Sequence, residues 1–104
     1  MTRIPDVEHC HTMAEVRRNI DELDERIVAL IAERSGYVAQ AARIKQSADQ
    51  VHDQARIDFI VERVKAMAAA QGAPEAVIEA AYRAMIDASI EFERGEFKRL
   101  RQET

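Results

Sequence analysis

Residues 16–45 decide the fold, and they read VRRNIDELDERIVALIAERSGYVAQAARIK. Intervals of four and three alternate here without interruption through Val16, Ile20, Leu23, Ile27, Leu30, Arg34, Tyr37, Ala41 and Ile44. This spacing is typical of a helix that packs along other helices. Arg34 is the one charged residue of the repeat, and a charge on a packing face is costly unless something pairs with it. We therefore expect a distant acid or an anionic ligand to neutralise Arg34.

Helix-capping signals divide the rest of the chain. Thr12 and Glu15 form a T-x-x-E capping box ahead of the first helix, which we expect to run to about residue 46. Polar residues 47–52 predict a loop, Asp53 predicts the N-cap of a second helix, and Gly72 predicts its end. Pro74 then opens a third helix. The predicted fold class is all-α, with one long N-terminal helix and two shorter ones.

The length of the first helix predicts a partner chain. With 104 residues we expect one helical domain over residues 12–104, preceded by a flexible tail over residues 1–11. The first helix would be ~51 Å long at 1.5 Å per residue. A compact domain of this size has a radius of gyration of only ~13 Å, so two shorter helices cannot cover the whole apolar repeat. We expect an intertwined homodimer in which the long helices pack side by side.

Composition excludes several classes of protein. A net charge of −4 argues against a nucleic-acid-binding domain. Cys10 is the single cysteine, so there is no internal disulfide, which fits a reducing compartment. Neither a signal peptide nor a membrane span of ~18 apolar residues is apparent, and we expect a cytoplasmic protein. His9 and His11 flank Cys10, but no fourth metal ligand is evident, so we expect no metal.

Three basic residues of the first helix indicate an anion site. Arg34 and Lys45 lie ~16 Å apart along the helix axis and share one face, so their side chains can converge on a small dianion. Arg17 lies ~25 Å from Arg34 and could reach the same ligand only from an antiparallel partner helix. The alternative for Arg17 and Lys45 is that they are solvated surface charges.

The other two helices add polar candidates. Asp53 and Arg56 lie at the start of the second helix, where Asp53 could be simply a cap. Ser89 and Glu93 lie four residues apart on the apolar stripe of the third helix, although Glu93 could be solvated. The sequence has no Ser/His/Asp pattern and no Gly-rich phosphate loop, so nothing supports nucleophilic or nucleotide chemistry.

Residues 16–34, Lys45 and the D-x-x-R motif of residues 53–56 resemble the all-α class of chorismate mutases. The resemblance covers about residues 13–97 and implies an intertwined helical dimer with two active sites, each built from both chains. It implies that Arg17 of one chain and Arg34 of the other bind the two substrate carboxylates. Lys45 would contact a carboxylate and the ether oxygen. The pocket would be bordered by Asp53, Arg56 and Ser89.

Two positions differ from the usual bacterial pattern. Ile57 stands where bacterial mutases commonly have a Glu that binds the substrate hydroxyl, and the related isochorismate pyruvate lyases have an apolar residue there. Glu93 stands where bacterial mutases commonly have Gln as a donor to the ether oxygen, although a fungal branch uses Glu. Glu93 can donate a hydrogen bond only when protonated, so we expect activity to fall as pH rises through its titration.

The resemblance implies rearrangement of chorismate to prephenate, a step of the shikimate pathway of aromatic amino acid biosynthesis. This pericyclic reaction needs no nucleophile and no cofactor, and electrostatic stabilisation by Lys45, Glu93 and Arg34 would carry the catalysis. One alternative is an isochorismate pyruvate lyase, which forms salicylate and pyruvate; such lyases often show weak mutase activity. Another alternative is a non-catalytic helical dimer that binds a metabolite or a protein partner.

Overall fold

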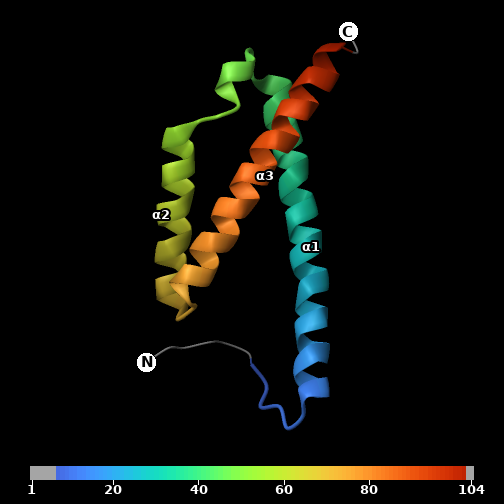
Figure 1. The fold of residues 1–104 in the computed structure, drawn as a ribbon, viewed down its shortest axis with the longest axis vertical. Coiled ribbons are helices and arrows are strands. Elements are labelled where there is room, and N and C mark those ends of the chain that lie inside the picture. Colours follow the sequence, from blue (N-terminus) through green and yellow to red (C-terminus); the bar gives the residue numbers. More distant parts are fainter. Residues whose placement is uncertain (1–6, 103–104) are drawn as a thin grey trace.

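A computed structural model describes residues 7–102 and contains three α-helices (Figure 1). They are α1 (Met13–Ile44), α2 (Gln54–Gln71) and α3 (Glu75–Gln102), with a short 3-10 turn at Ala48–Gln50 between the first two. No strand occurs within the described residues. The predicted all-α class is confirmed, although α3, with 28 residues, is nearly as long as α1, with 32.

The predicted capping residue begins α1. Thr12 Oγ1 accepts a hydrogen bond from the backbone N–H of Glu15 at 3.2 Å. The Glu15 carboxylate accepts a hydrogen bond from the N–H of His11 at 2.9 Å. A standard capping box would use the N–H of Thr12 instead, so this hydrogen bond is shifted by one residue toward the N-terminus. α1 ends two residues earlier than predicted, because Lys45 takes an extended backbone conformation with φ −60° and ψ 143°.

The boundaries of α2 and the start of α3 agree with the sequence. Asp53 Oδ1 accepts from the N–H of Arg56 at 3.0 Å and caps α2. Gly72 ends α2 with a φ of 70°, a left-handed conformation in which glycine has no steric penalty. Pro74 immediately precedes α3. Residues 47–52 are not the plain loop predicted, because the Gln50 side chain accepts from the N–H of Gln46 at 2.8 Å and helps to close a 3-10 turn.

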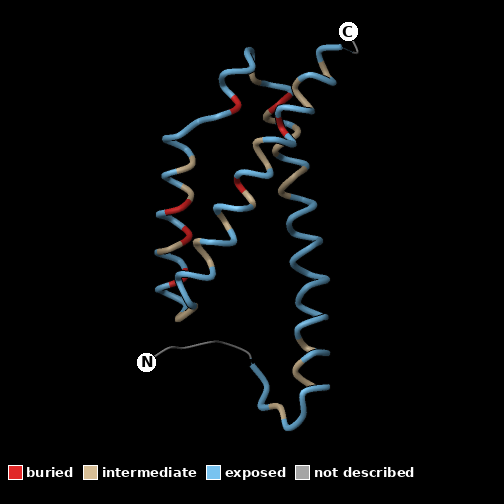
Figure 2. Tube along the Cα trace, viewed as in Figure 1, coloured by how far each residue is buried: buried red, intermediate tan, exposed pale blue. Residues whose placement is uncertain are grey.

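α3 runs diagonally between the other two helices and contacts both (Figure 1). Its N-terminal part lies against α2, and its C-terminal part crosses the C-terminal end of α1. Residues coloured as buried in Figure 2 lie on the segments that make these contacts, and the apolar ones form the core. They are Ala42, Val51, Val61, Val64, Ala68 and Ile86. The core of one chain is therefore small and leaves much of α1 without a neighbour.

One chain alone leaves the apolar repeat of α1 uncovered. The chain measures 57 × 26 × 16 Å and has a radius of gyration of 17.3 Å, against ~13 Å for a compact domain of this length. All residues from 20 to 33 are exposed (Figure 2). Ile20, Leu23, Ile27 and Leu30 each keep between 50% and 64% of their surface exposed. Large exposed apolar stripes of this kind mark interaction surfaces.

The predicted N-terminal tail falls partly outside the described residues, which exclude residues 1–6 and 103–104. Residues 7–12 precede α1 without helical structure. A membrane-spanning segment is not found among the helices between residues 7 and 102.

Candidate active site

A cavity of about 420 Å³ is lined by all three helices and by the segment before α2. Its volume lies within the range of roughly 300–1,000 Å³ that is usual for small-molecule sites. All the site residues predicted from the sequence line this cavity, except Arg17. They are Arg34 from α1, Lys45 at the C-cap of α1, Asp53, Arg56 and Ile57 at the start of α2, and Ser89 and Glu93 from α3.

Arg34 lies at the point where α3 begins to cover α1. It is half-buried, whereas the residues from 20 to 33 are exposed. Its Nη1 donates to Ser89 Oγ at 3.4 Å, across 55 residues of sequence. None of the ion pairs formed within residues 7–102 involves Arg34. The distant acid is therefore not found in this part of the chain, and the guanidinium lies on the cavity wall with only a hydroxyl partner.

Lys45 and Glu93 form an ion pair on the cavity wall. Lys45 Nζ donates to Glu93 Oε2 at 2.6 Å. Glu93 is 6% exposed and is the one buried charged residue among residues 7–102. Removing one partner of such a pair leaves a buried charge uncompensated, which typically costs about 3–5 kcal/mol. The solvated alternative for Glu93 is thus wrong in this structure, and Lys45, with a side chain 26% exposed, is not a free surface charge.

Asp53 and Arg56 combine local and cavity-facing positions. The N-cap interpretation of Asp53 is confirmed, and the same residue also lines the cavity. The guanidinium of Arg56 lies 5.2 Å from the ring centroid of Phe59, one turn further along α2. A cation–π contact of this kind holds the side chain without neutralising its charge.

The walls of the cavity are mainly branched aliphatic side chains. Ile57 and Ile60 line it from α2, and Ile86 and Ile90 line it from α3. Ile57 follows Arg56 directly and presents no hydrogen-bonding group to a ligand. An apolar wall strengthens the electrostatic interactions of the nearby charged groups.

Seven lining residues are not among the predicted site residues: Tyr37, Val38, Ala41, Val51, Ile60, Ile86 and Ile90. Tyr37 and Ala41 belong to the packing repeat of α1, and their position between Arg34 and Lys45 in that repeat is the sequence signal that places them at the cavity. Val51 carries no periodic signal, because it follows the 3-10 turn and only the folded chain brings it to the cavity.

Arg17 lies in the exposed N-terminal half of α1, away from the cavity of its own chain. Arg17 and Arg34 are ~25 Å apart along the straight helix. Like Arg34, Arg17 takes no part in the ion pairs of residues 7–102.

The lining residues fit an anion better than a metal. Three basic side chains outnumber the two acidic ones by one in the cavity lining. Among residues 7–102, no group of three or more His, Cys, Asp or Glu side chains is arranged around a common point where a metal could bind. The rings of His9 and His11 contact each other edge to face at 4.9 Å, outside the cavity.

Comparison with known proteins gives a consistent family. The sequence profile of the family chorismate mutase type II matches residues 16–94. The chain is also similar to a chorismate mutase from Methanocaldococcus jannaschii, with 39% identity over 54 residues. That alignment covers 51% of this chain and 54% of the relative, so the chain spans about half the length of the curated relative that it matches.

Proposed function

Because the chain belongs to the chorismate mutase type II family, we propose that it rearranges chorismate to prephenate in the cavity between its three helices. The observation that carries this proposal is the joint position of Arg34, Lys45 and Glu93 on one apolar cavity. Arg34 and Lys45 supply positive charge at two points, as a dicarboxylate requires. The reaction needs no covalent participation from the protein, which agrees with the residue types that line the cavity.

The cavity residues would act by positioning and by electrostatic stabilisation. Arg34 would bind one carboxylate of the substrate and hold it in the compact conformer from which the rearrangement proceeds. Lys45 would contact a carboxylate and the ether oxygen, on which negative charge grows in the transition state. Asp53, Arg56 and Ser89 would border the substrate, and Ser89 would orient Arg34 through their hydrogen bond.

Glu93 would act in two ways that depend on its protonation. As a carboxylate it holds the Lys45 ammonium at 2.6 Å and directs it toward the cavity. When protonated it can itself donate to the ether oxygen. Because glutamine can donate in its place at any pH, Glu93→Gln tests this second role.

We further propose that the active unit is a homodimer. The exposed stripe of Ile20, Leu23, Ile27 and Leu30 supports a second copy as the cover of α1. Burying one large aliphatic side chain contributes about 1.5–3 kcal/mol, so the half-exposed stripe favours association by several such contributions. In an antiparallel pair, Arg17 of the second copy would reach the cavity and supply the second carboxylate contact. It would raise the excess of positive charge from one to two, which matches a dianion.

The domain and the pathway follow from the same proposal. Residues 12–104 would form one chorismate mutase-like helical domain. It would work in the cytoplasm, in the shikimate pathway of aromatic amino acid biosynthesis.

One observation favours a second candidate, isochorismate pyruvate lyase. Ile57 lines the cavity next to Arg56, and its side chain has no group that could form a hydrogen bond with the substrate. A mutase site gains affinity from a group that binds the substrate hydroxyl, and a buried hydroxyl without a partner is penalised. A non-catalytic helical dimer has less support, because a packing module has no use for a half-buried Arg34 without an acidic partner.

A side-by-side assay of the purified protein with chorismate and with isochorismate tests the proposal. Prephenate formation at a kcat/KM of about 10⁴ M⁻¹ s⁻¹ or more is expected for the mutase. Pyruvate release from isochorismate, with slow prephenate formation only, would identify the lyase. No turnover of either compound by a folded dimer would leave the binding module.

A further inference from the structure

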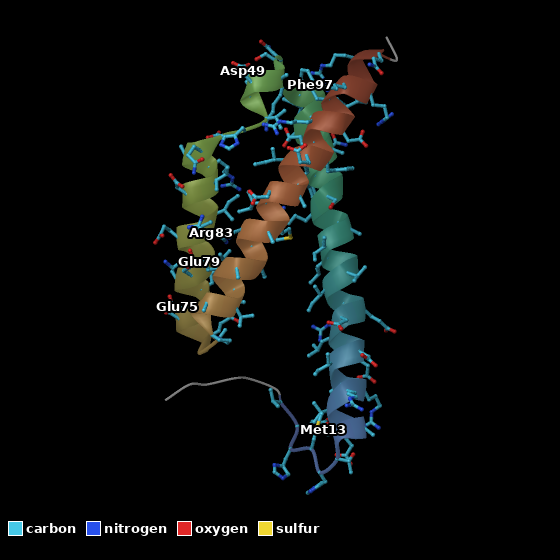
Figure 3. All side chains as sticks on the ribbon, viewed as in Figure 1. Met13, Asp49, Glu75, Glu79, Arg83 and Phe97 are labelled. Atoms are coloured by element: carbon cyan, nitrogen blue, oxygen red, sulfur yellow. The ribbon has the colours of Figure 1, made fainter. Side chains whose placement is uncertain are left out.

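Arg101 connects the end of α3 to the end of α1. Its Nη1 donates to the carbonyl oxygen of Ala42 at 2.7 Å, and its Nη2 donates to the carbonyl oxygen of Lys45. The guanidinium also lies over the ring of Phe97, 3.7 Å from the centroid. Figure 3 shows Phe97 on the part of α3 that crosses the C-terminal end of α1. Arg101 lies beyond residues 16–94, which the family profile matches.

These carbonyls need partners from outside α1. The last four carbonyl oxygens of a helix have no N–H donor within that helix. Ala42 is fully buried, so water is poorly placed to satisfy its carbonyl, and an unsatisfied buried carbonyl is costly. A charged guanidinium that donates to two carbonyls is among the stronger ways to hold a helix end.

Lys45 is held by α3 at both ends. Arg101 binds its backbone carbonyl, and Glu93 binds its ammonium group. Glu93, Phe97 and Arg101 are spaced four residues apart, so they follow one another along one face of α3. Lys45 is also the C-cap residue of α1, where the backbone turns from helical to extended. The direction of its side chain into the cavity therefore depends on how this cap is fixed.

We propose that Arg101 is a positioning residue that fixes Lys45 in the cavity by binding the C-terminal end of α1. Arg101 does not line the cavity, so it acts through Lys45 rather than on the substrate. This inference rests on the proposed function of the site. Its physical basis is that misplacing a catalytic group by about 1 Å can cost about 10²-fold in rate.

A double-mutant cycle tests the coupling between the two residues. Arg101→Met removes the donors and keeps a long side chain that can cover Phe97, and we expect it to lower kcat about 10- to 100-fold with a smaller change in KM. In a Lys45→Gln background the same substitution should change kcat less than about twofold, because the residue that it positions is already gone. The matched control is Arg94→Met, which removes an exposed arginine of α3 that pairs with Glu91 on the surface.

Equal losses of kcat in both backgrounds would overturn the proposal and assign Arg101 a general structural role. An undiminished kcat for a folded Arg101→Met variant would also overturn it. If that variant does not fold, Arg101→Lys replaces it in the cycle. Lysine keeps the charge but lacks the two-pronged guanidinium, so an intermediate loss that disappears in the Lys45→Gln background is expected.

A readout without substrate separates this proposal from the proposed function. The rate at which an N-hydroxysuccinimide ester acetylates Lys45 is measured by mass spectrometry. It is expressed relative to the acetylation rate of the exposed Lys98 in the same sample. We expect Arg101→Met to accelerate labelling of Lys45 about fivefold, as for the loss of roughly one hydrogen bond, and Arg94→Met to leave it unchanged. Faster labelling in a protein that turns over no chorismate would retain the positioning role and reject the mutase. Unchanged labelling would reject the positioning role whatever the activity.

Discussion

Mixing two impaired variants should restore part of the activity if the site is shared between chains. Arg17→Gln and Arg34→Gln each remove one proposed carboxylate contact. In a symmetric dimer with antiparallel α1 helices, each site would take Arg34 from one chain and Arg17 from the other. A heterodimer of the two variants then has one site that lacks both arginines and one site that is intact.

The expected magnitudes follow from the geometry. Truncating one side of a hydrogen-bonded charge pair costs about 2–5 kcal/mol, so each variant should lose roughly 30-fold to several thousand-fold in kcat/KM. Random exchange of equal amounts makes half of the dimers heterodimers, so about one quarter of all sites are intact and the mixture recovers about a quarter of wild-type activity. If both arginines acted within one chain, the mixture would show only the average of the two variants. The ~25 Å between the residues along α1 argues against that arrangement.

The assay measures loss of chorismate before and after subunit exchange, and native mass spectrometry confirms that heterodimers have formed. Arg18→Gln is the matched control, because Arg18 is the exposed neighbour of Arg17 and has no assigned role. It should keep near wild-type activity. Absence of recovery in a mixture that contains heterodimers would refute the shared site, and full activity of Arg17→Gln alone would refute the role of Arg17.

Three further predictions concern the dimer, the cavity and the contact between α2 and α3. Leu23 is 51% exposed on the apolar stripe, so Leu23→Arg should disrupt the dimer. In sedimentation at micromolar concentration we expect the variant near the chain mass of 11.8 kDa and the unaltered protein at about twice that mass. A monomeric unaltered protein would contradict the dimer. Glu93→Gln keeps a hydrogen-bond donor at every pH, so its profile of kcat/KM against pH should be flat where that of the unaltered protein falls at higher pH; identical profiles would reject Glu93 as the donor. Glu79 lies on α3 near Arg83 (Figure 3), and a hydrogen bond from Arg83 and the charge of Lys65 on α2 lower its pKa below the ordinary 4.5. Because the pKa of Glu79 is lower in the folded than in the unfolded chain, its carboxylate stabilises the fold at pH values above the unfolded pKa, and this stabilisation is lost as pH falls through the folded pKa. Urea titrations should therefore show that Glu79→Gln lowers the free energy of unfolding at neutral pH. The difference in that free energy between variant and unaltered protein should narrow below about pH 4. A difference that stays constant with pH would mean that the carboxylate is not involved.

Much of the fold could be predicted because its signals are local. The four-three repeat of α1 required only the sequence, and so did the caps at Thr12, Asp53 and Gly72, since each depends on residues within one turn. The end of α1 was predicted two residues late, because the extended backbone at Lys45 is accompanied by contacts of its carbonyl with α3 rather than by a local breaker such as proline. The turn at residues 48–50 also has a local signal that the loop prediction overlooks, because Ser47 and Gln50 form an S-x-x-Q capping box in which the glutamine side chain bonds back to the main chain.

By itself the sequence determined the helices, the face of α1 that carries Arg34, and the spacing that aligns Arg34 with Lys45. Only the tertiary structure decided which partners those charges have. Arg34 meets Ser89 across 55 residues, Lys45 meets Glu93 across 48, and Arg101 meets Ala42 across 59. Such contacts depend on the angle at which α3 crosses α1, and that angle is set by side-chain packing at the crossing rather than by any local propensity.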